Sequence, residues 1–240
     1  MVFRLTLLIL LLVVTAASGE TLNTCLDCHG RVLLSHDFVA ETPVPLVDCV
    51  RCHRGNNQTR RKVLAHSQRI DACYAWFRLP DTAIMKAARE SIDRFACRRC
   101  HVQNRKGHLL AADLDRLLQQ RSIEEITLAL ENPAYYMPDF ALGEEDRQLV
   151  ILALLAGGTN PFDQSEEDVA IVHFEDPATE ERPFEKHCGS CHRVLTLHLG
   201  GLGTTTVAPN LSGLLTPFYP HNFKENQLWT ADGLSRWIKN

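Results

Sequence analysis

The motif Cys-x-x-Cys-His occurs four times in this chain of 240 residues, at Cys25–His29, Cys49–His53, Cys97–His101 and Cys188–His192. Eight of the nine cysteines belong to these motifs, and a histidine directly follows every Cys-x-x-Cys pair. Any fold that the chain adopts must present four sets of two thiols and one imidazole. This requirement constrains the structure more than the overall composition does.

Two chemistries use paired cysteines of this spacing. Cys-x-x-Cys-His attaches a c-type haem, whose two thioether bonds come from the thiols and whose iron takes the histidine as an axial ligand. Paired Cys-x-x-Cys knuckles also build tetrahedral zinc sites, but zinc does not require histidine directly after the second cysteine. With only 11 histidines in the chain, four such placements favour haem. We therefore expect four c-type haems, bound through Cys25, Cys28, Cys49, Cys52, Cys97, Cys100, Cys188 and Cys191, with His29, His53, His101 and His192 on the iron atoms.

Residues 1–19 are typical of a secretory signal peptide. Arg4 supplies a short positive start, Leu5 to Val14 form an apolar run, and small residues precede Glu20. The run is too short to span a bilayer comfortably, and no later stretch is long enough. We expect an exported bacterial protein of the periplasm, with no membrane span after cleavage.

The charge distribution is uneven. Basic residues outnumber acidic ones from Arg51 to Lys106, and acidic residues dominate from Asp163 to Glu185. Such runs are commonly solvated faces or linkers. A basic surface around Arg98 and Arg99 is a second possibility, and it would steer an acidic redox partner or neutralise haem propionates. Nucleic acid is not an expected partner, because these residues surround haem motifs in an exported protein.

The pattern predicts a mainly α protein organised around its haems. A loop-rich module with two haems (20–75) precedes a helical domain with the third (78–158), an acidic linker (159–182) and a segment with the fourth (183–240). We call residues 78–158 and 183–240 the third and the fourth block, after the motifs that they contain. In the third block, Asp81 or Thr82 caps a helix with a stripe formed by Ile84, Ala88, Ile92 and Phe95. Ser122 and Glu125 form a capping box that opens a helix ending at Asn132-Pro133, and a last helix covers residues 144–156.

This third block resembles a class I cytochrome c domain, in which a helix, Cys-x-x-Cys-His, further helices, a methionine loop and a closing helix follow one another. The resemblance covers about 80 residues and depends on Cys97–His101 and Met137-Pro138. It implies that Met137 is the sixth ligand of the third haem. Met85 precedes the haem motif, and core packing suits it better.

The fourth block repeats the third in part. Residues 208–213 are similar to the loop on the proximal side of many class I domains, and residues 230–240 align without a gap with residues 122–132. The equivalents of Met137 and of the closing helix would follow Asn240. We therefore expect this sequence to be a fragment or a truncated gene model. The competing interpretation gives the fourth haem another sixth ligand, His198 or His221, or none.

The first two haems have no nearby methionine, so their sixth ligands should be histidines. His36 and His66 are the spare histidines of this block. His36 lies only seven residues after His29, and two turns of a shared helix would separate them by roughly 10.5 Å, too far to bind one iron from opposite faces. We favour His36 on the second haem and His66 on the first. The block from Cys49 to His66 is similar to the paired-haem modules of multihaem cytochromes in metal-reducing bacteria.

These features predict a periplasmic tetrahaem cytochrome that relays single electrons between redox partner proteins, in a respiratory or an oxyanion- or metal-reducing chain. The alternative is a multihaem reductase with an open coordination site at the fourth haem. The ninth cysteine, Cys73, lies near aromatic residues and is expected to be a small buried apolar side chain.

Overall fold

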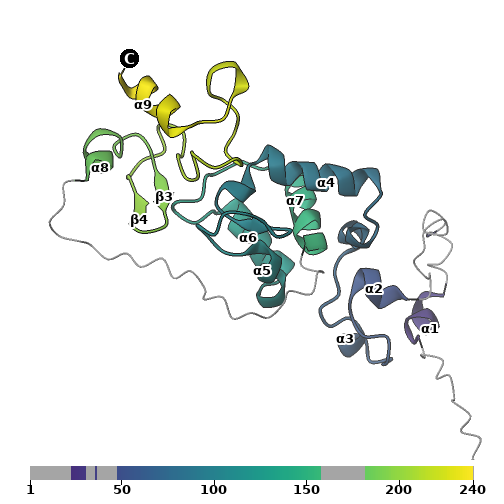
Figure 1. Ribbon diagram of the computed structural model, residues 1–240. Coiled ribbons are helices and arrows are strands. Elements are labelled where there is room, and N and C mark those ends of the chain that lie inside the picture. The colour runs from purple at the N-terminus through teal and green to yellow at the C-terminus, as the bar shows by residue number, and fades with distance from the viewer. Residues whose placement is uncertain (1–22, 31–35, 37–47, 158–181, 240) are drawn as a thin grey trace, which may run out of the picture. The chain divides into compact units, whose positions relative to one another are not determined.

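The computed structural model describes residues 23–30, 36, 48–157 and 182–239 (Figure 1). The expected signal peptide and nearly all of the acidic linker lie outside these residues. The chain divides into two compact units, one formed by Met1–Val50 and Gly55–Ser67 and the other by Arg51–Arg54 and Gln68–Asn240. Each unit is considered by itself below.

The first unit contains short helices joined by loops. They are α1 (Cys25–His29), the first residues of α2 (Cys49–His53), and α3 (Lys62–Ala65). The buried hydroxyl of Thr24, directly before α1, donates to the carbonyls of Asn57 and Thr59, both at 2.9 Å. These bonds fix the start of the first Cys-x-x-Cys-His motif on a segment more than thirty residues further along the chain.

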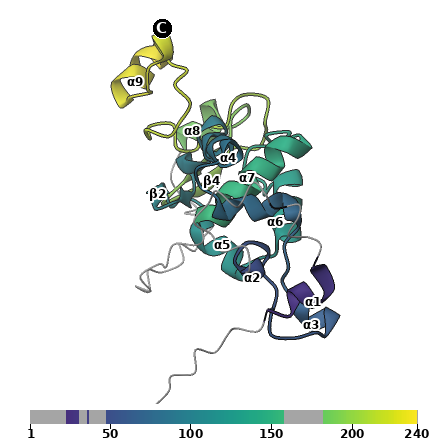
Figure 2. The same cartoon turned by 90° about the vertical axis from the view of Figure 1, so that its right-hand side faces the viewer.

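The second unit begins with a helical core. Its elements, in chain order, are η3 (Ala72–Arg78), α4 (Ala83–Arg94), η4 (Cys97–Arg99), β1 (Val102–Gln103), β2 (Lys106–Gly107), α5 (Leu114–Gln120), α6 (Ile123–Glu131) and α7 (Glu144–Gly157). Helices α4 and α7 pack side by side (Figures 1 and 2). Met85, Ala88 and Ile92 of α4 are fully buried against the run Val150–Leu155 of α7. Met85 is therefore a core residue, as the sequence predicts.

Local sequence signals explain the ends of these helices. Ser122 and Glu125 form the predicted capping box of α6, and the helix ends before Asn132 as expected. Helix α4 begins after Thr82, but the Thr82 hydroxyl donates to the Leu79 carbonyl and does not cap the helix. The predicted side-chain cap is wrong, because the preceding turn offers that hydroxyl an acceptor at 2.8 Å.

The remainder of the second unit surrounds the fourth motif. It contains α8 (Pro183–His187), β3 (Val194–Thr196), β4 (Gly200–Leu202), η5 (Lys224–Asn226) and α9 (Ala231–Lys239). Both strand pairs, β1–β2 and β3–β4, are antiparallel hairpins of two strands. The described part of the chain is thus rich in helices with few short strands, in agreement with a mainly α class. The hairpins and α5 have no counterpart in the sequence-based expectation.

Candidate haem attachment sites

The third motif forms a tight turn at the end of α4. The amides of Cys100 and His101 both donate to the carbonyl of Cys97, at 3.2 and 3.0 Å. Ala96, directly before the motif, adopts a left-handed conformation with φ of 52°, and this sharp bend ends the helix and starts the turn. Cys97, Cys100 and His101 are thereby presented on one turn of backbone.

A hydrogen bond fixes the orientation of the His101 ring. Its Nδ1 lies 2.7 Å from the carbonyl oxygen of Ala112. Burial lowers the pKa of His101, although the bond to Ala112 opposes this effect, so the neutral ring is favoured. A carbonyl only accepts hydrogen bonds, so Nδ1 carries the proton and Nε2 keeps its lone pair for a metal. Burial also raises the pKa of the Cys97 thiol to about 11.

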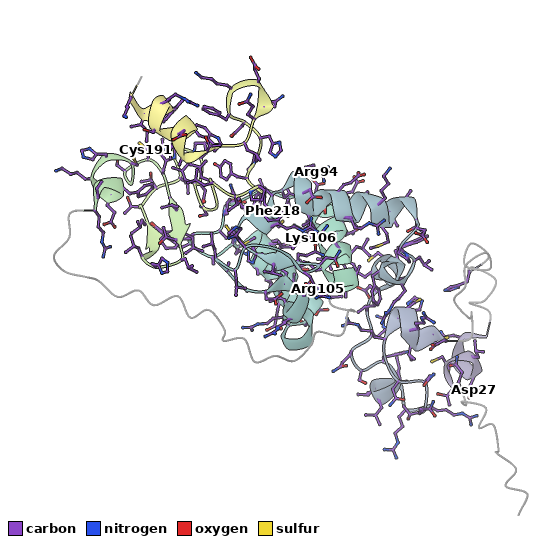
Figure 3. All side chains as sticks on the ribbon, viewed as in Figure 1. Asp27, Arg94, Arg105, Lys106, Cys191 and Phe218 are labelled. Carbon is purple, nitrogen blue, oxygen red and sulfur yellow. The ribbon has the colours of Figure 1, made fainter. Side chains whose placement is uncertain are left out.

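The fourth motif is built in the same way. The His192 amide donates to the Cys188 carbonyl at 2.8 Å, and His192 Nδ1 lies 2.7 Å from the carbonyl oxygen of Pro209. Cys191 lies at the surface (Figure 3). Pro209 belongs to the loop 208–213, which was compared above with the loop on the proximal side of class I cytochrome c domains. The backbone carbonyls of Ala112 and Pro209, which accept from the two Nδ1 atoms, were not identified from the sequence.

The likeness between these two sites extends to the loops that support them. The Ala111 amide donates to the Cys100 carbonyl and the Ala208 amide to the Cys191 carbonyl, at 2.9 and 3.0 Å. In the next turn, Asp113 accepts from the amide of Asp115, and Asn210 accepts from that of Ser212, both at 2.9 Å. The Asp115 carboxylate and the Ser212 hydroxyl then accept from amides just beyond the respective Cys-x-x-Cys-His motifs, those of Asn104 and Leu195, both at 2.7 Å.

A glycine completes each of the two sites. A Cβ atom at Gly107 would lie 2.0 Å from the carbonyl oxygen of His101, and one at Gly203 would lie 1.9 Å from that of His192. Both glycines have positive φ, 129° and 85°. In each site the chain therefore passes directly over the backbone of the candidate ligand, at the end of β2 in one and just after β4 in the other, and only glycine permits so close an approach.

Two histidine rings lie close together in the first unit. The rings of His29 and His66, both in the first unit, have centroids 5.9 Å apart and planes inclined at 44°. Two imidazoles on one metal, each bonded at about 2 Å with its ring centre about 1.1 Å behind the nitrogen, have centroids about 6 Å apart. The observed separation fits one iron between the two rings.

Backbone contacts explain how His66 reaches this place. The Asn56 amide donates to the Ala65 carbonyl at 2.9 Å, and Gly55, with φ of 85°, lets the chain pass so close to Ala65 that a Cβ would lie 2.6 Å from its oxygen. Within the same unit, the Cys25 thiol lies near Cys49, and its pKa is raised by burial and then by this neighbour. The first cysteines of two motifs are thus adjacent.

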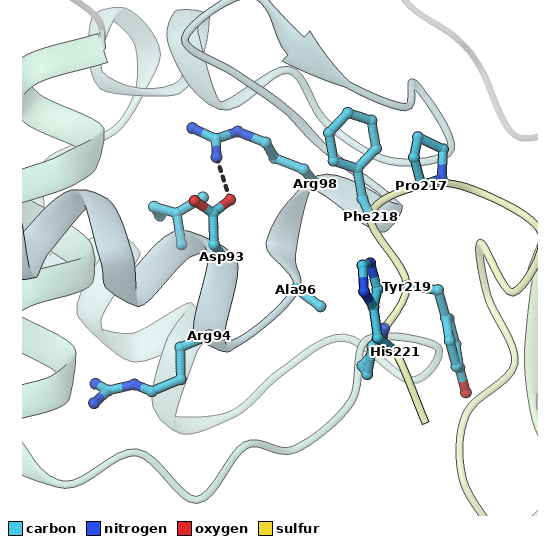
Figure 4. Close-up of a pocket in the computed structure, with 10 residues that line it drawn as sticks. Asp93, Arg94, Ala96, Arg98, Pro217, Phe218, Tyr219 and His221 are labelled. Atoms are coloured by element: carbon cyan, nitrogen blue, oxygen red, sulfur yellow. Dashed lines mark hydrogen bonds and ion pairs between the residues drawn. The ribbon is translucent and has the colours of Figure 1, made fainter. Parts of the chain in front are cut away.

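The other candidate ligands occupy separate places. Met137 lies half-buried in the loop between α6 and α7, and His36 is half-buried in the first unit. His198 is exposed in the turn of the β3–β4 hairpin. His221 is also exposed and lines a pocket of 310 Å³ with residues from the end of α4 and from the loop 217–220 (Figure 4).

The two arginines inside the third motif do not form an exposed basic patch. Arg99 is 7 % exposed, its guanidinium lies over the Tyr219 ring, and it donates to the Asn210 carbonyl. Arg98 pairs with Asp93 (Figure 4) and also bonds Gln103. The expected basic surface around Arg98 and Arg99 is therefore wrong, because both guanidinium groups have partners within the chain. Cys73 is exposed, which contradicts the expected burial.

Comparison of the chain with protein-family models, with curated proteins and with solved structures finds no match. In the described ranges no helix has the length and apolar character needed to span a membrane. The same residues contain no cluster of three or more histidine, cysteine or acidic side chains placed to hold a metal ion.

Proposed function

We propose that this chain is a multihaem c-type cytochrome. The observation that carries the proposal is the hydrogen bond from Nδ1 of the motif histidine to a backbone carbonyl, at 2.7 Å in both the third and the fourth motif. This bond leaves Nε2 as the metal-binding nitrogen and orients the ring, as is usual for histidine ligands. Two thiols on the same turn provide the thioether positions.

More specifically, we propose a periplasmic tetrahaem carrier of single electrons between redox partner proteins. The haem iron supplies the one-electron chemistry when it is bound. Cys97 and Cys100, with their counterparts in the other motifs, would anchor the group. His101 and His192, oriented by Ala112 and Pro209, would bind the iron.

The sixth positions are assigned from the remaining histidines and the methionine loop. His66 faces His29 at a separation that suits one iron, so these two residues are proposed to share the first haem. His36 is proposed for the second haem and Met137 for the third. A histidine–methionine pair raises the reduction potential relative to two histidines, so electrons would move toward the third haem.

The test uses the full chain, exported with its signal peptide in a host that matures c-type cytochromes. Intact mass should show four covalent haems, and optical and EPR spectra of the oxidised and reduced protein should show low-spin haems that do not bind carbon monoxide. A haem-free protein that copurifies with zinc would refute the proposal. A high-spin haem that binds carbon monoxide would instead support the multihaem reductase, with an open site at the fourth haem.

A further inference from the structure

The loop that carries Met137 is bound by the fourth block. The side-chain amide of Asn210 donates to the carbonyl of Tyr136, the residue directly before Met137, at 2.9 Å. The hydroxyl of Tyr136 donates to the Gly201 carbonyl of β4 at 3.0 Å. Tyr136 is thus bonded to Gly201 and Asn210, which lie 65 and 74 positions further along the sequence. These bonds hold the segment that presents the candidate ligand.

Arg193 makes the second attachment. Its guanidinium lies 3.6 Å from the centre of the Tyr135 ring and donates to the Tyr135 carbonyl. The Tyr135 hydroxyl in turn donates to the Thr204 carbonyl at 2.7 Å. Together with the contacts of Tyr136, these bonds hold both residues before Met137 through their backbone and through their side chains.

Close packing leaves this loop little freedom. A Cβ atom at Gly201 would lie 2.1 Å from the ring of Tyr136, so the ring rests directly on the glycine backbone. A tyrosine held at its ring, its hydroxyl and its carbonyl has few alternative positions. The backbone of the following residue, Met137, is therefore also limited in the positions that it can take.

The residues that hold the loop are neighbours of the fourth haem ligand. Arg193 directly follows His192, and Asn210 directly follows Pro209, whose carbonyl receives the hydrogen bond from His192. One peptide bond therefore separates each residue of the fourth site from a residue that binds the methionine loop. A shift of the backbone at the fourth site should move that loop as well.

We propose that Asn210 and Arg193 are positioning residues for Met137, so that the fourth block sets how the third haem receives its sixth ligand. The inference rests on the proposed function, since it requires haem in the third motif. It assigns the fourth block a second role besides holding its own haem. The potential of the third haem depends on this contact, because methionine ligation raises it.

The decisive variant is Asn210→Asp. Its carboxylate still accepts from the Ser212 amide, as Asp113 does from the Asp115 amide in the third block. It removes the donor to Tyr136 and places an anionic oxygen against that carbonyl. We expect four haems by mass, a loss of methionine-ligated signal from one of them, and a shift of one midpoint potential to a lower value. The signals are the long-wavelength band of the oxidised haem and the proton NMR resonance of the ligating methionine methyl group.

Three further variants frame the result. Met137→Ala defines complete loss of the signal, and Tyr136→Phe, which removes the bond to Gly201, should act in the same direction as Asn210→Asp. Thr205→Ala is the matched control, because its hydroxyl donates to Ser190 within the fourth block and does not touch the loop. If Asn210→Asp does not fold, Tyr136→Phe decides.

The outcomes separate the two proposals. Unchanged methionine signal and potentials in Asn210→Asp and Tyr136→Phe, as in Thr205→Ala, would overturn the inference alone. Four haems in the wild-type protein without any methionine-ligated haem would also overturn it; the proposed tetrahaem electron carrier would stand, without its assignment of Met137. A wild-type protein without covalent haem would refute both the proposed function and this inference.

Discussion

Replacement of Gly203 by alanine tests the structure of the fourth site most directly. Gly203 has φ of 85°, and its new Cβ would lie 1.9 Å from the carbonyl oxygen of His192. Observed Cβ atoms essentially never approach closer than 3.0 Å, so the carbonyl or the hairpin must move by about 1 Å. That oxygen belongs to the residue that we place on the fourth iron.

The expected cost has two parts. The left-handed conformation costs an alanine roughly 1–2 kcal/mol. Forcing a methyl group into a packed site costs about 1–3 kcal/mol more, because the surrounding backbone must shift. Gly203→Ala should therefore lower the free energy of unfolding by about 2–5 kcal/mol, a large part of the roughly 5–15 kcal/mol that stabilises a typical domain.

Denaturant unfolding of the haem-loaded protein, followed by circular dichroism and by haem absorbance, measures this loss. Gly143→Ala is the control, because a Cβ at Gly143 meets no atom within 4 Å; since Gly143 directly precedes α7, a weaker helix start should cost it no more than about 1 kcal/mol. Equal unfolding midpoints for the two variants would refute the close approach of Gly203 to His192. A large loss for Gly203→Ala alone would support it.

Three other changes have defined outcomes. His66→Ala should open one haem to carbon monoxide in a difference spectrum, whereas His108→Ala, at an exposed histidine, should not. The pKa of Glu125 lies below its ordinary value of 4.5, mainly because the Ser122 amide donates to it, so its stabilisation of α6 is present above pH 4.5 and is lost as the pH falls through the folded pKa. Glu125→Gln should make the melting temperature less sensitive to acid between about pH 5 and 3. Ser212→Ala leaves the Leu195 amide without its acceptor and should cost about 1–3 kcal/mol in urea unfolding.

The sequence predicted best the elements whose determinants are local. The capping box at Ser122 and Glu125 places donors and acceptors three residues apart, so it specifies the start of α6 without reference to the remainder of the chain. The position of α4 likewise followed from its apolar stripe, of which Ala88 and Ile92 are fully buried. The histidines and cysteines of each motif were evident from spacing alone.

Features that depend on distant partners were missed. Arg99 was expected at the surface. Its guanidinium instead lies over the Tyr219 ring and donates to the Asn210 carbonyl, and both partners are more than 100 positions further along the chain. The hairpin β1–β2 has two residues in each strand, too few for an alternating pattern to appear. The carbonyls of Ala112 and Pro209 carry no side-chain signal, because any residue type offers a carbonyl.

The third and fourth sites share their backbone geometry although the side chains that support them differ. Ala112 and Pro209 have unlike side chains, and each offers the same carbonyl to Nδ1 at 2.7 Å. A carboxylate at Asp115 and a hydroxyl at Ser212 bind equivalent amides beyond the two motifs. Since backbone geometry is common to both sites and side-chain chemistry is not, ligand orientation depends on how each loop is bent. The turns closed by Asp113 and Asn210 set that bend, and in the fourth block the same asparagine also holds the Met137 loop.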